Sequence, residues 1–124
     1  MSSSPAFPYE TRLNVLHRPL EIIDIHVPDA KNYKWFNQTL CQVNDSVVRV
    51  GIIEGEYHWH KHDNDDEFFL TVEGQLLIDL EDKTIELNPG QGFVVPRNVV
   101  HRTRAPKRTV ILMVENAGII PTGN

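Results

Sequence analysis

The chain has 124 residues, which is enough for one hydrophobic core but too few for two, so we expect a single domain. Its 17 acidic residues outnumber its 12 basic ones, and the net charge of −5 argues against a nucleic-acid partner. One cysteine allows no internal disulfide, and the first residues lack the features of a secretory signal, so we expect a cytoplasmic protein. No apolar run approaches the ~20 residues that cross a bilayer, and we expect no membrane partner.

Residues 1–19 contain three prolines among serines and other polar residues, a composition that favours an extended, flexible N-terminal arm. Residues 20–124 form the predicted domain. Near its start, Asp29–Asn37 is predicted as a short helix, with Pro28 before it and Asp29 as the N-cap.

From residue 38 onward, short apolar or alternating runs are separated by turn residues, which is typical of an all-β protein. The predicted strands are Thr39–Val43, Ser46–Ile53, Tyr57–His62, Glu67–Val72, Gln75–Leu80, Thr84–Leu87, Gly92–Val95 and Thr109–Glu115. Turns are predicted at Asn44–Asp45, Glu73–Gly74 and Pro89–Gly90, because Asn and Gly tolerate positive φ. This many short strands favours a sandwich or a jelly-roll barrel.

The predicted strand Tyr57–His62 carries histidines at alternate positions. Because side chains alternate along a strand, His58, His60 and His62 would share one face. The other face would carry Tyr57, Trp59 and Lys61. Two residues along a strand rise by about 6.6 Å, a gap that two imidazoles can bridge to reach one metal ion. The pattern therefore indicates a metal site.

Glu67 opens the next predicted strand and is a candidate for a further metal ligand. The same alternation places Phe69 and Thr71 inward and Phe68 and Leu70 outward. Since both faces of this strand are apolar, the outer face needs a cover. The N-terminal arm or a second subunit could provide it, and we expect a homodimer.

The last histidine, His101, follows a Gly-rich turn and a short apolar run that Pro96 ends. Counting from His101, Thr103 and Ala105 would face inward and the arginines between them outward. These arginines belong to a basic cluster for which we expect a solvated surface, with anion binding as the alternative. The cluster consists of Arg97, Arg102, Arg104, Lys107 and Arg108.

Two spaced patterns contain these residues. The first, H-x-H, four residues, E, six residues, G, is formed by His60, His62, Glu67 and Gly74. The second, G, five residues, P-x-N, two residues, H, is formed by Gly90, Pro96, Asn98 and His101. With these motifs the sequence resembles the cupin superfamily, in particular its small single-domain (monocupin) metal-binding members.

Three positions depart from the family motifs. The glycine expected before the first histidine is displaced by one position, to Gly55. Asn98 stands where glycine is usual, and we expect the turn to survive because Asn tolerates a left-handed backbone. Ala105 replaces the trailing asparagine of the second motif, which removes a polar group but no expected ligand.

The resemblance implies a double-stranded β-helix, or jelly-roll barrel, over about residues 38–115. It also implies that His60, His62, Glu67 and His101 bind one divalent metal ion. Three imidazoles and one carboxylate suit Fe, Mn, Zn, Ni or Co, and they leave one or two coordination positions open.

An open metal position favours a metal-dependent enzyme that acts on a small molecule. A dioxygenase-like oxidoreductase is preferred, because it needs little beyond the ligands and an apolar pocket. A metal-dependent isomerase or lyase would also need a placed base, and His58 is predicted as that catalytic residue unless it supports a metal ligand or packs opposite Thr71. A non-catalytic small-molecule-binding domain is the remaining alternative.

Overall fold

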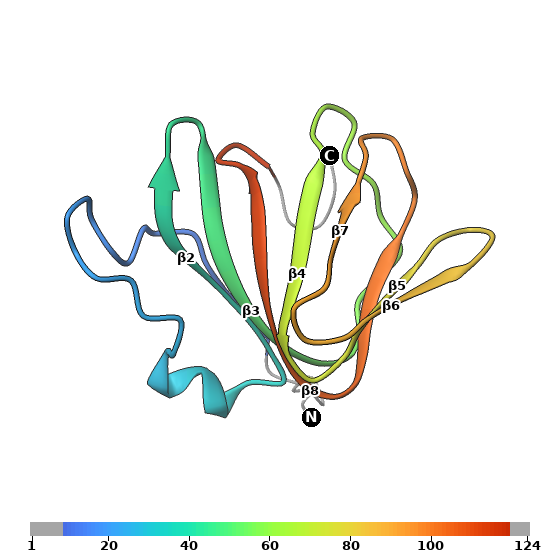
Figure 1. Cartoon of the computed structure of the whole chain (residues 1–124), viewed down its shortest axis with the longest axis horizontal. Helices are drawn as coiled ribbons and strands as arrows, with labels where there is room; N and C mark the ends of the chain where they lie inside the picture. The colour runs from blue at the N-terminus through green and yellow to red at the C-terminus, as the bar shows by residue number, and fades with distance from the viewer. Residues whose placement is uncertain (1–8, 120–124) are drawn as a thin grey trace, which may run out of the picture.

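The computed structural model describes residues 9–119, which form an all-β fold with one short 3₁₀ helix. The strands are β1 (Tyr9–Arg12), β2 (Trp35–Val43), β3 (Ser46–Glu56), β4 (Glu67–Glu73), β5 (Leu76–Asp79), β6 (Thr84–Leu87), β7 (Gly92–Val95) and β8 (Arg102–Asn116). Figure 1 shows two walls that open like a V, with β2 and β3 in one and β4 and β7 in the other. The predicted double-stranded β-helix is confirmed.

The eight strands form one continuous hydrogen-bonded sheet that is organised around β8. Along one edge β8 pairs antiparallel with β3, and along the other it pairs with β4 and β5. β2 continues the sheet beyond β3, and β7 continues it beyond β4. Because β8 lies between strands from both halves of the chain, its start and the preceding His101 come next to segments that are distant in sequence.

Alternating burial along β4 and β8 follows the predicted faces. Glu67, Phe69 and Thr71 are buried and the residues between them are half-buried. Thr103 and Ala105 at the start of β8 are buried as well. The inward assignment of these residues is confirmed, and it sets the direction in which Glu67 projects.

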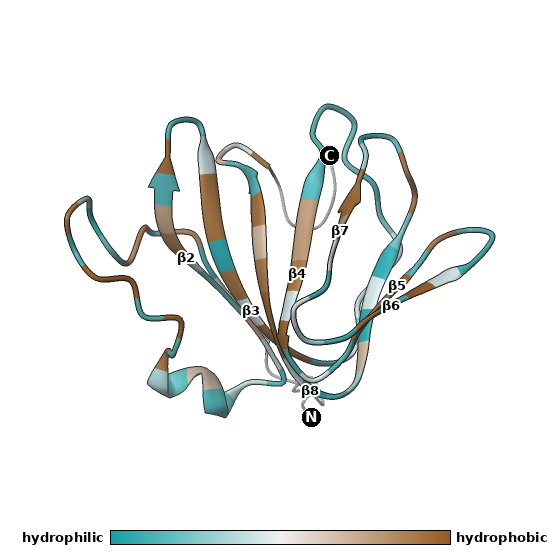
Figure 2. Ribbon diagram, viewed as in Figure 1, coloured by the Kyte–Doolittle hydropathy of each residue, from teal (hydrophilic) through white to brown (hydrophobic). Residues whose placement is uncertain are grey.

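Apolar side chains form two clusters, one on each face of β2 and β3, and Figure 2 shows the apolar stretches of these strands and of β8. The inner cluster fills the barrel with Trp35, Ile53, Phe69, Leu76, Ile78, Leu87, Val95, Ala105, Ile111 and Met113. The outer cluster contains Ala30, Phe36, Leu40, Val50 and Ile52. Burial on both faces explains why residues 47–53 of β3 are apolar in succession, with Arg49 as the exception.

The helix predicted at Asp29–Asn37 is a 3₁₀ helix, η1, at Pro28–Asn32, and this is a correction. Its N-cap is Val27, without a side-chain cap, and Asp29 lies within the first turn. The chain then turns into a strand at Trp35, which pairs with Ile53 of β3. Burial of the Trp35 and Phe36 rings in the two clusters favours the strand over a longer helix.

The predicted strand Tyr57–His62 is not a strand, which is a second correction. β3 ends at Glu56 after a register shift at Gly55, where φ is 101°. Beyond it the segment makes one β-bridge, between His60 and His101. Strict alternation is lost as a result, so Tyr57 packs half-buried against the inner cluster while His58 is exposed.

Positive φ angles occur at the predicted turn positions. Gly74 has φ of 84°, and a Cβ there would lie 2.4 Å from Oγ1 of Thr109, so only glycine fits. Asn98 has φ of 66°, which confirms that asparagine preserves the motif turn in place of glycine.

Part of the predicted N-terminal arm is ordered against the barrel. β1 pairs in parallel with β2, and Tyr9 stacks on Trp35 with ring centroids 6.0 Å apart. Residues 1–8 lie outside the described range, so flexibility of the arm and a boundary at residue 20 stay predictions. Within residues 9–119, no helix has the length and apolar character required of a membrane span.

Candidate metal centre

His60 and His101 face each other across the β-bridge that joins the 57–62 segment to the start of β8. Two backbone hydrogen bonds of 2.9 Å hold the bridge, each from the N–H of one histidine to the carbonyl of the other. Nδ1 of His60 lies 3.0 Å from the carbonyl oxygen of His58, and Nδ1 of His101 lies 2.9 Å from that of Val99. A carbonyl only accepts, so each Nδ1 carries the proton and each Nε2 keeps its lone pair. This is how proteins orient histidines that bind metals.

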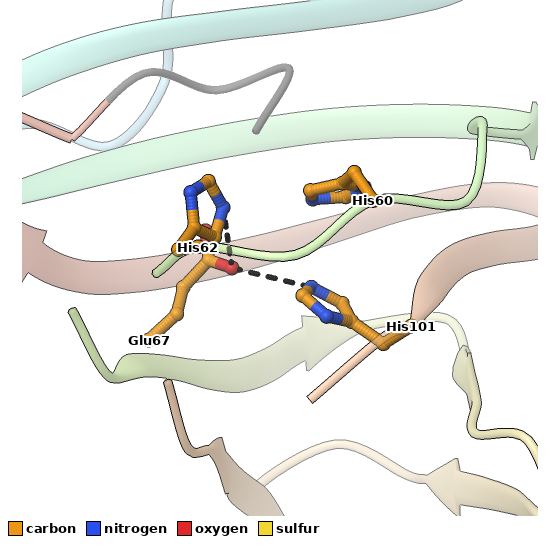
Figure 3. A group of neighbouring side chains, drawn as sticks. All are labelled: His60, His62, Glu67 and His101. Atoms are coloured by element: carbon orange, nitrogen blue, oxygen red, sulfur yellow. Dashed lines mark ion pairs between the residues drawn. The ribbon is translucent and has the colours of Figure 1, made fainter. Parts of the chain in front are cut away.

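His62 and Glu67 complete a group of four side chains (Figure 3). Oε1 of Glu67 lies 3.6 Å from Nε2 of His62 and 3.5 Å from Nε2 of His101. One donor atom from each of the four side chains lies within 4.8 Å of the others. Donor atoms on one ion, with bonds of about 2.1 Å, are up to about 4.2 Å apart. A contraction of a few tenths of an ångström would therefore bring all four to one ion.

The donor atoms have unmet bonding capacity. Oε1 of Glu67 and Nε2 of His101 are buried and form no hydrogen bond with other described residues. Burying such atoms is costly unless something pairs with them, and a cation that accepts both lone pairs would remove the cost. The observed residues thus fit a divalent metal ion held by three nitrogens and one oxygen.

The electrostatics of the four residues suit the same role. Burial lowers the pKa of His60 to about 4, so its ring is neutral near pH 7, as a metal ligand must be. Burial alone would raise the pKa of Glu67, but the neighbouring His101 and Glu115 side chains hold it below its usual value. Glu67 is therefore ionised and supplies a negative charge.

A cavity on the inside of the barrel adjoins two of the four residues, His60 and Glu67. About 40 Å³ of it is open to the centres of water-sized atoms. The cavity is lined by Trp35, Asn37, Arg49, Ile53, Tyr57, His60, Glu67, Phe69, Thr103, Ile111, Met113 and Glu115. Because His60 and Glu67 lie in its wall, a molecule in this cavity would be next to the candidate metal site.

Two charged residues of this wall, Arg49 and Glu115, were missed by the sequence analysis. Both are buried, and Nη1 of Arg49 lies 3.4 Å from Oε1 of Glu115. Burial and, after it, the negative charge of Glu67 together raise the pKa of Glu115 to about 9. A signal existed in the sequence, since Arg49 interrupts the apolar run of β3 at a position that cannot face water if both faces are covered.

His58 was predicted to share an inward face with His60 and His62, and this placement is wrong because the segment is not a strand. Its side chain is exposed, with its ring centroid 5.2 Å from that of His60. Other titratable side chains also lie near the candidate ligands, since the cavity wall includes Tyr57, Arg49 and Glu115. A catalytic role for His58 stays a prediction.

The basic cluster faces outward as expected, and most of its guanidinium groups have protein partners. Arg102 and Arg104 donate hydrogen bonds to Asp79, and Arg97 donates to Asp66. Arg108 donates to the backbone carbonyls of Tyr33 and Ala30. These contacts fasten β5, the 96–101 loop and η1 to the barrel.

The family model of the cupin domain matches residues 47–115. The chain belongs to the cupin family. It is similar to the uncharacterized protein YdbB of Bacillus subtilis, with 45% identity over 84 residues that cover 67% of this chain and 74% of that one.

Solved structures agree with this membership. A cupin-2 domain protein from Shewanella frigidimarina is 32% identical, with a TM-score of 0.64, over 64% of this chain and 78% of that one. Ectoine synthase from P. lautus is 19% identical, with a TM-score of 0.59, over 68% and 64% of the two chains, and shares the fold alone. Cupins of different function thus have this architecture, and the activity must be argued from the site.

Proposed function

We propose that this cupin binds one divalent transition-metal ion through His60, His62, Glu67 and His101 and acts on a small molecule in the adjoining cavity. The observation that carries the proposal is the set of buried donor atoms, two of which lack any hydrogen bond among residues 9–119. Four protein ligands leave one or two positions of an octahedral ion for a substrate.

The residues of the site have separate roles in this proposal. His60 and His101 are held by backbone carbonyls with Nε2 available to the metal, and Glu67 contributes the negative charge. A bound ion would act as a Lewis acid or, if it is iron, support chemistry with O₂. Trp35 and Phe69 form apolar wall and limit the access of water to the cavity.

A dioxygenase-like oxidoreductase is the preferred reaction class, because most of the cavity wall is apolar or aromatic and such enzymes rely mainly on the metal. A metal-dependent isomerase or lyase is the second candidate, and the Glu115 carboxyl in the wall favours it as a proton-transfer group. The exposed His58 could serve only a substrate that extends out of the cavity.

Turnover assays distinguish these possibilities. Protein loaded with Fe(II) under reductant should consume O₂ with one or more members of a panel of small aromatic diols, thiols and carboxylic acids, while the His60→Ala variant should not. Conversion without O₂ consumption by the zinc or manganese form would favour the isomerase or lyase. If the protein binds a ligand but forms no product, the result would favour a binding protein over an enzyme.

We also propose that the chain forms a homodimer through the outer face of the second wall. Val94, Phe68 and Val114 are directly opposite one another across β7, β4 and β8. Val94 and Val114 are 50% and 36% exposed, so this end of the outer face is apolar and uncovered by the described residues. A second copy would remove that apolar surface from water.

A further inference from the structure

Arg49 is a buried guanidinium with unused hydrogen-bonding capacity. It projects from β3 into the barrel, with 3% of its surface exposed. Its one ion pair is the 3.4 Å contact between Nη1 and Oε1 of Glu115, and its Nε forms no hydrogen bond within residues 9–119. A buried guanidinium is costly unless its donors are satisfied, so a further hydrogen-bond acceptor near Nε would stabilise this side chain.

Arg49 also lines the cavity next to the candidate metal centre. The cavity wall includes Arg49, His60 and Glu67, so one molecule could meet the guanidinium and the metal site together. Asn37 and Thr103 add neutral polar groups, and Trp35 and Phe69 add aromatic surface. Glu115 pairs with Nη1 of the guanidinium, and Nε has no hydrogen-bond partner within residues 9–119.

Charge in this part of the barrel favours an anion. The charged side chains of the cavity wall are one guanidinium and two carboxyl groups, those of Glu67 and Glu115. A divalent ion would leave the site with a net positive charge even with both carboxyl groups ionised. An anionic ligand would offset this charge, and Arg binds carboxylates through two parallel hydrogen bonds.

The cavity also limits the size of the ligand. One water molecule needs about 10–15 Å³ by this measure. The 40 Å³ observed therefore holds a group of only a few non-hydrogen atoms. A larger molecule would have to extend toward solvent.

We propose that the substrate or ligand of this site is a small carboxylic acid whose carboxylate is bound by Arg49 inside the barrel. The proposal rests on the proposed function and assigns the substrate class of the same site. Arg49 is thereby a specificity-determining residue that selects anions over neutral molecules of the same shape.

Isothermal titration calorimetry with pyruvate and pyruvamide tests the proposal, because the two probes are alike in size and differ in charge. Zinc-loaded and metal-free protein are both titrated. We expect pyruvate to bind and pyruvamide to bind at least about tenfold more weakly, since a hydrogen-bonded charge contributes roughly a factor of 10 to 100 in affinity. Arg49→Met should lower pyruvate affinity by a similar factor and leave zinc content unchanged.

Control variants separate this effect from misfolding and from general loss of charge. Arg18→Met removes an exposed guanidinium that pairs with Glu21 at the surface, and pyruvate affinity should not change. Arg49→Met combined with Glu115→Gln avoids leaving the buried Glu115 carboxyl group without its partner and should show the same loss as Arg49→Met. Arg49→Lys keeps the charge without the planar donor pair and should recover affinity only in part.

Two different failures can be told apart by the zinc content. Wild-type protein that binds one zinc but takes pyruvate and pyruvamide equally, or binds neither, overturns the assignment of Arg49 and leaves the metal centre intact. Equal pyruvate affinity of wild type and the Arg49 variants also overturns it. Wild-type protein that binds no zinc contradicts the proposed function, whatever the pyruvate result.

Discussion

Asp79 fastens the β5–β6 hairpin to β8, and replacing it should destabilise the fold by a predictable amount. The carboxylate is 5% exposed and accepts hydrogen bonds from Thr84 (2.6 Å), Arg102 (2.8 Å) and Arg104 (2.7 and 3.1 Å). Only three residue pairs join β5 to β8, and Asp79↔Arg102 is one of them. Asp79→Asn removes the charge and one acceptor oxygen while keeping the shape.

Hydrogen bonds to charged groups contribute about 1.5–3 kcal/mol each, and breaking a buried ion pair costs about 3–5 kcal/mol. Both arginine side chains are partly exposed, at 27% and 31%, and can be rehydrated, so the lower end applies. We expect Asp79→Asn to lower the free energy of unfolding by about 3 kcal/mol and Tm by roughly 10 °C.

The effect of Asp79 should depend on pH in a defined direction. Hydrogen bonds from Arg104 hold the pKa of Asp79 well below its usual value. A depressed pKa in the folded state stabilises the protein above the unfolded pKa of about 3.9, and this contribution is lost as pH falls below that value. The stability difference between wild type and Asp79→Asn should thus be constant from pH 6 to 8 and shrink below about pH 4.

Urea denaturation followed by circular dichroism at several pH values measures this difference. Asp82→Asn, at an exposed position of the same hairpin, is the matched control and should change stability by less than about 0.5 kcal/mol. An Asp79→Asn protein as stable as wild type at pH 7 would refute the reasoning. So would a difference that grows as the pH falls.

Three further predictions concern the metal centre, a turn and the outer face. Glu67→Gln should weaken zinc affinity at least about tenfold in competition titrations, because the neutral amide is a poorer ligand than the carboxylate. Gly74→Ala should lower the free energy of unfolding by about 1–3 kcal/mol, and with it the measured Tm, because the added Cβ would meet Thr109 and φ is 84°. Val114→Glu should convert a dimer into a monomer in light scattering, and a wild-type monomer would contradict the proposed interface.

The strands could be predicted where local sequence and burial agree. β4 alternates between buried and half-buried residues, and its faces followed from the position of Glu67 alone. The turn at Gly74 and the left-handed Asn98 also followed from residue type, because few residues adopt positive φ. The four candidate ligands came together because motif spacing reflects strand length and turn length, which the fold fixes.

The segment after β3 could not be predicted by alternation. The pairing of β3 with β8 shifts register between Ile53 and Gly55 and ends after Glu56, and a shift of this kind arises from pairing with β8 rather than from the segment itself. Tyr57 consequently turns inward and His58 outward, opposite to the predicted faces.

Arg49 and Glu115 show a second limit of sequence reasoning. Each was counted as an ordinary member of a strand, because whether a charged residue is buried depends on a partner distant in sequence. β3 and β8 lie side by side, and only this pairing brings the two side chains together. Their presence adds a guanidinium and a carboxyl group to a cavity that was expected to be apolar.

Metal content tests the central claim most directly. Full-length protein purified without chelators or a histidine tag is measured by elemental mass spectrometry beside His101→Ala, with circular dichroism to confirm that the variant is folded. We expect about one equivalent of one transition metal in the wild type, before or after reconstitution, and almost none in the folded variant. Equal occupancy in both proteins, or no metal in reconstituted wild type, would contradict a metal centre at His60, His62, Glu67 and His101.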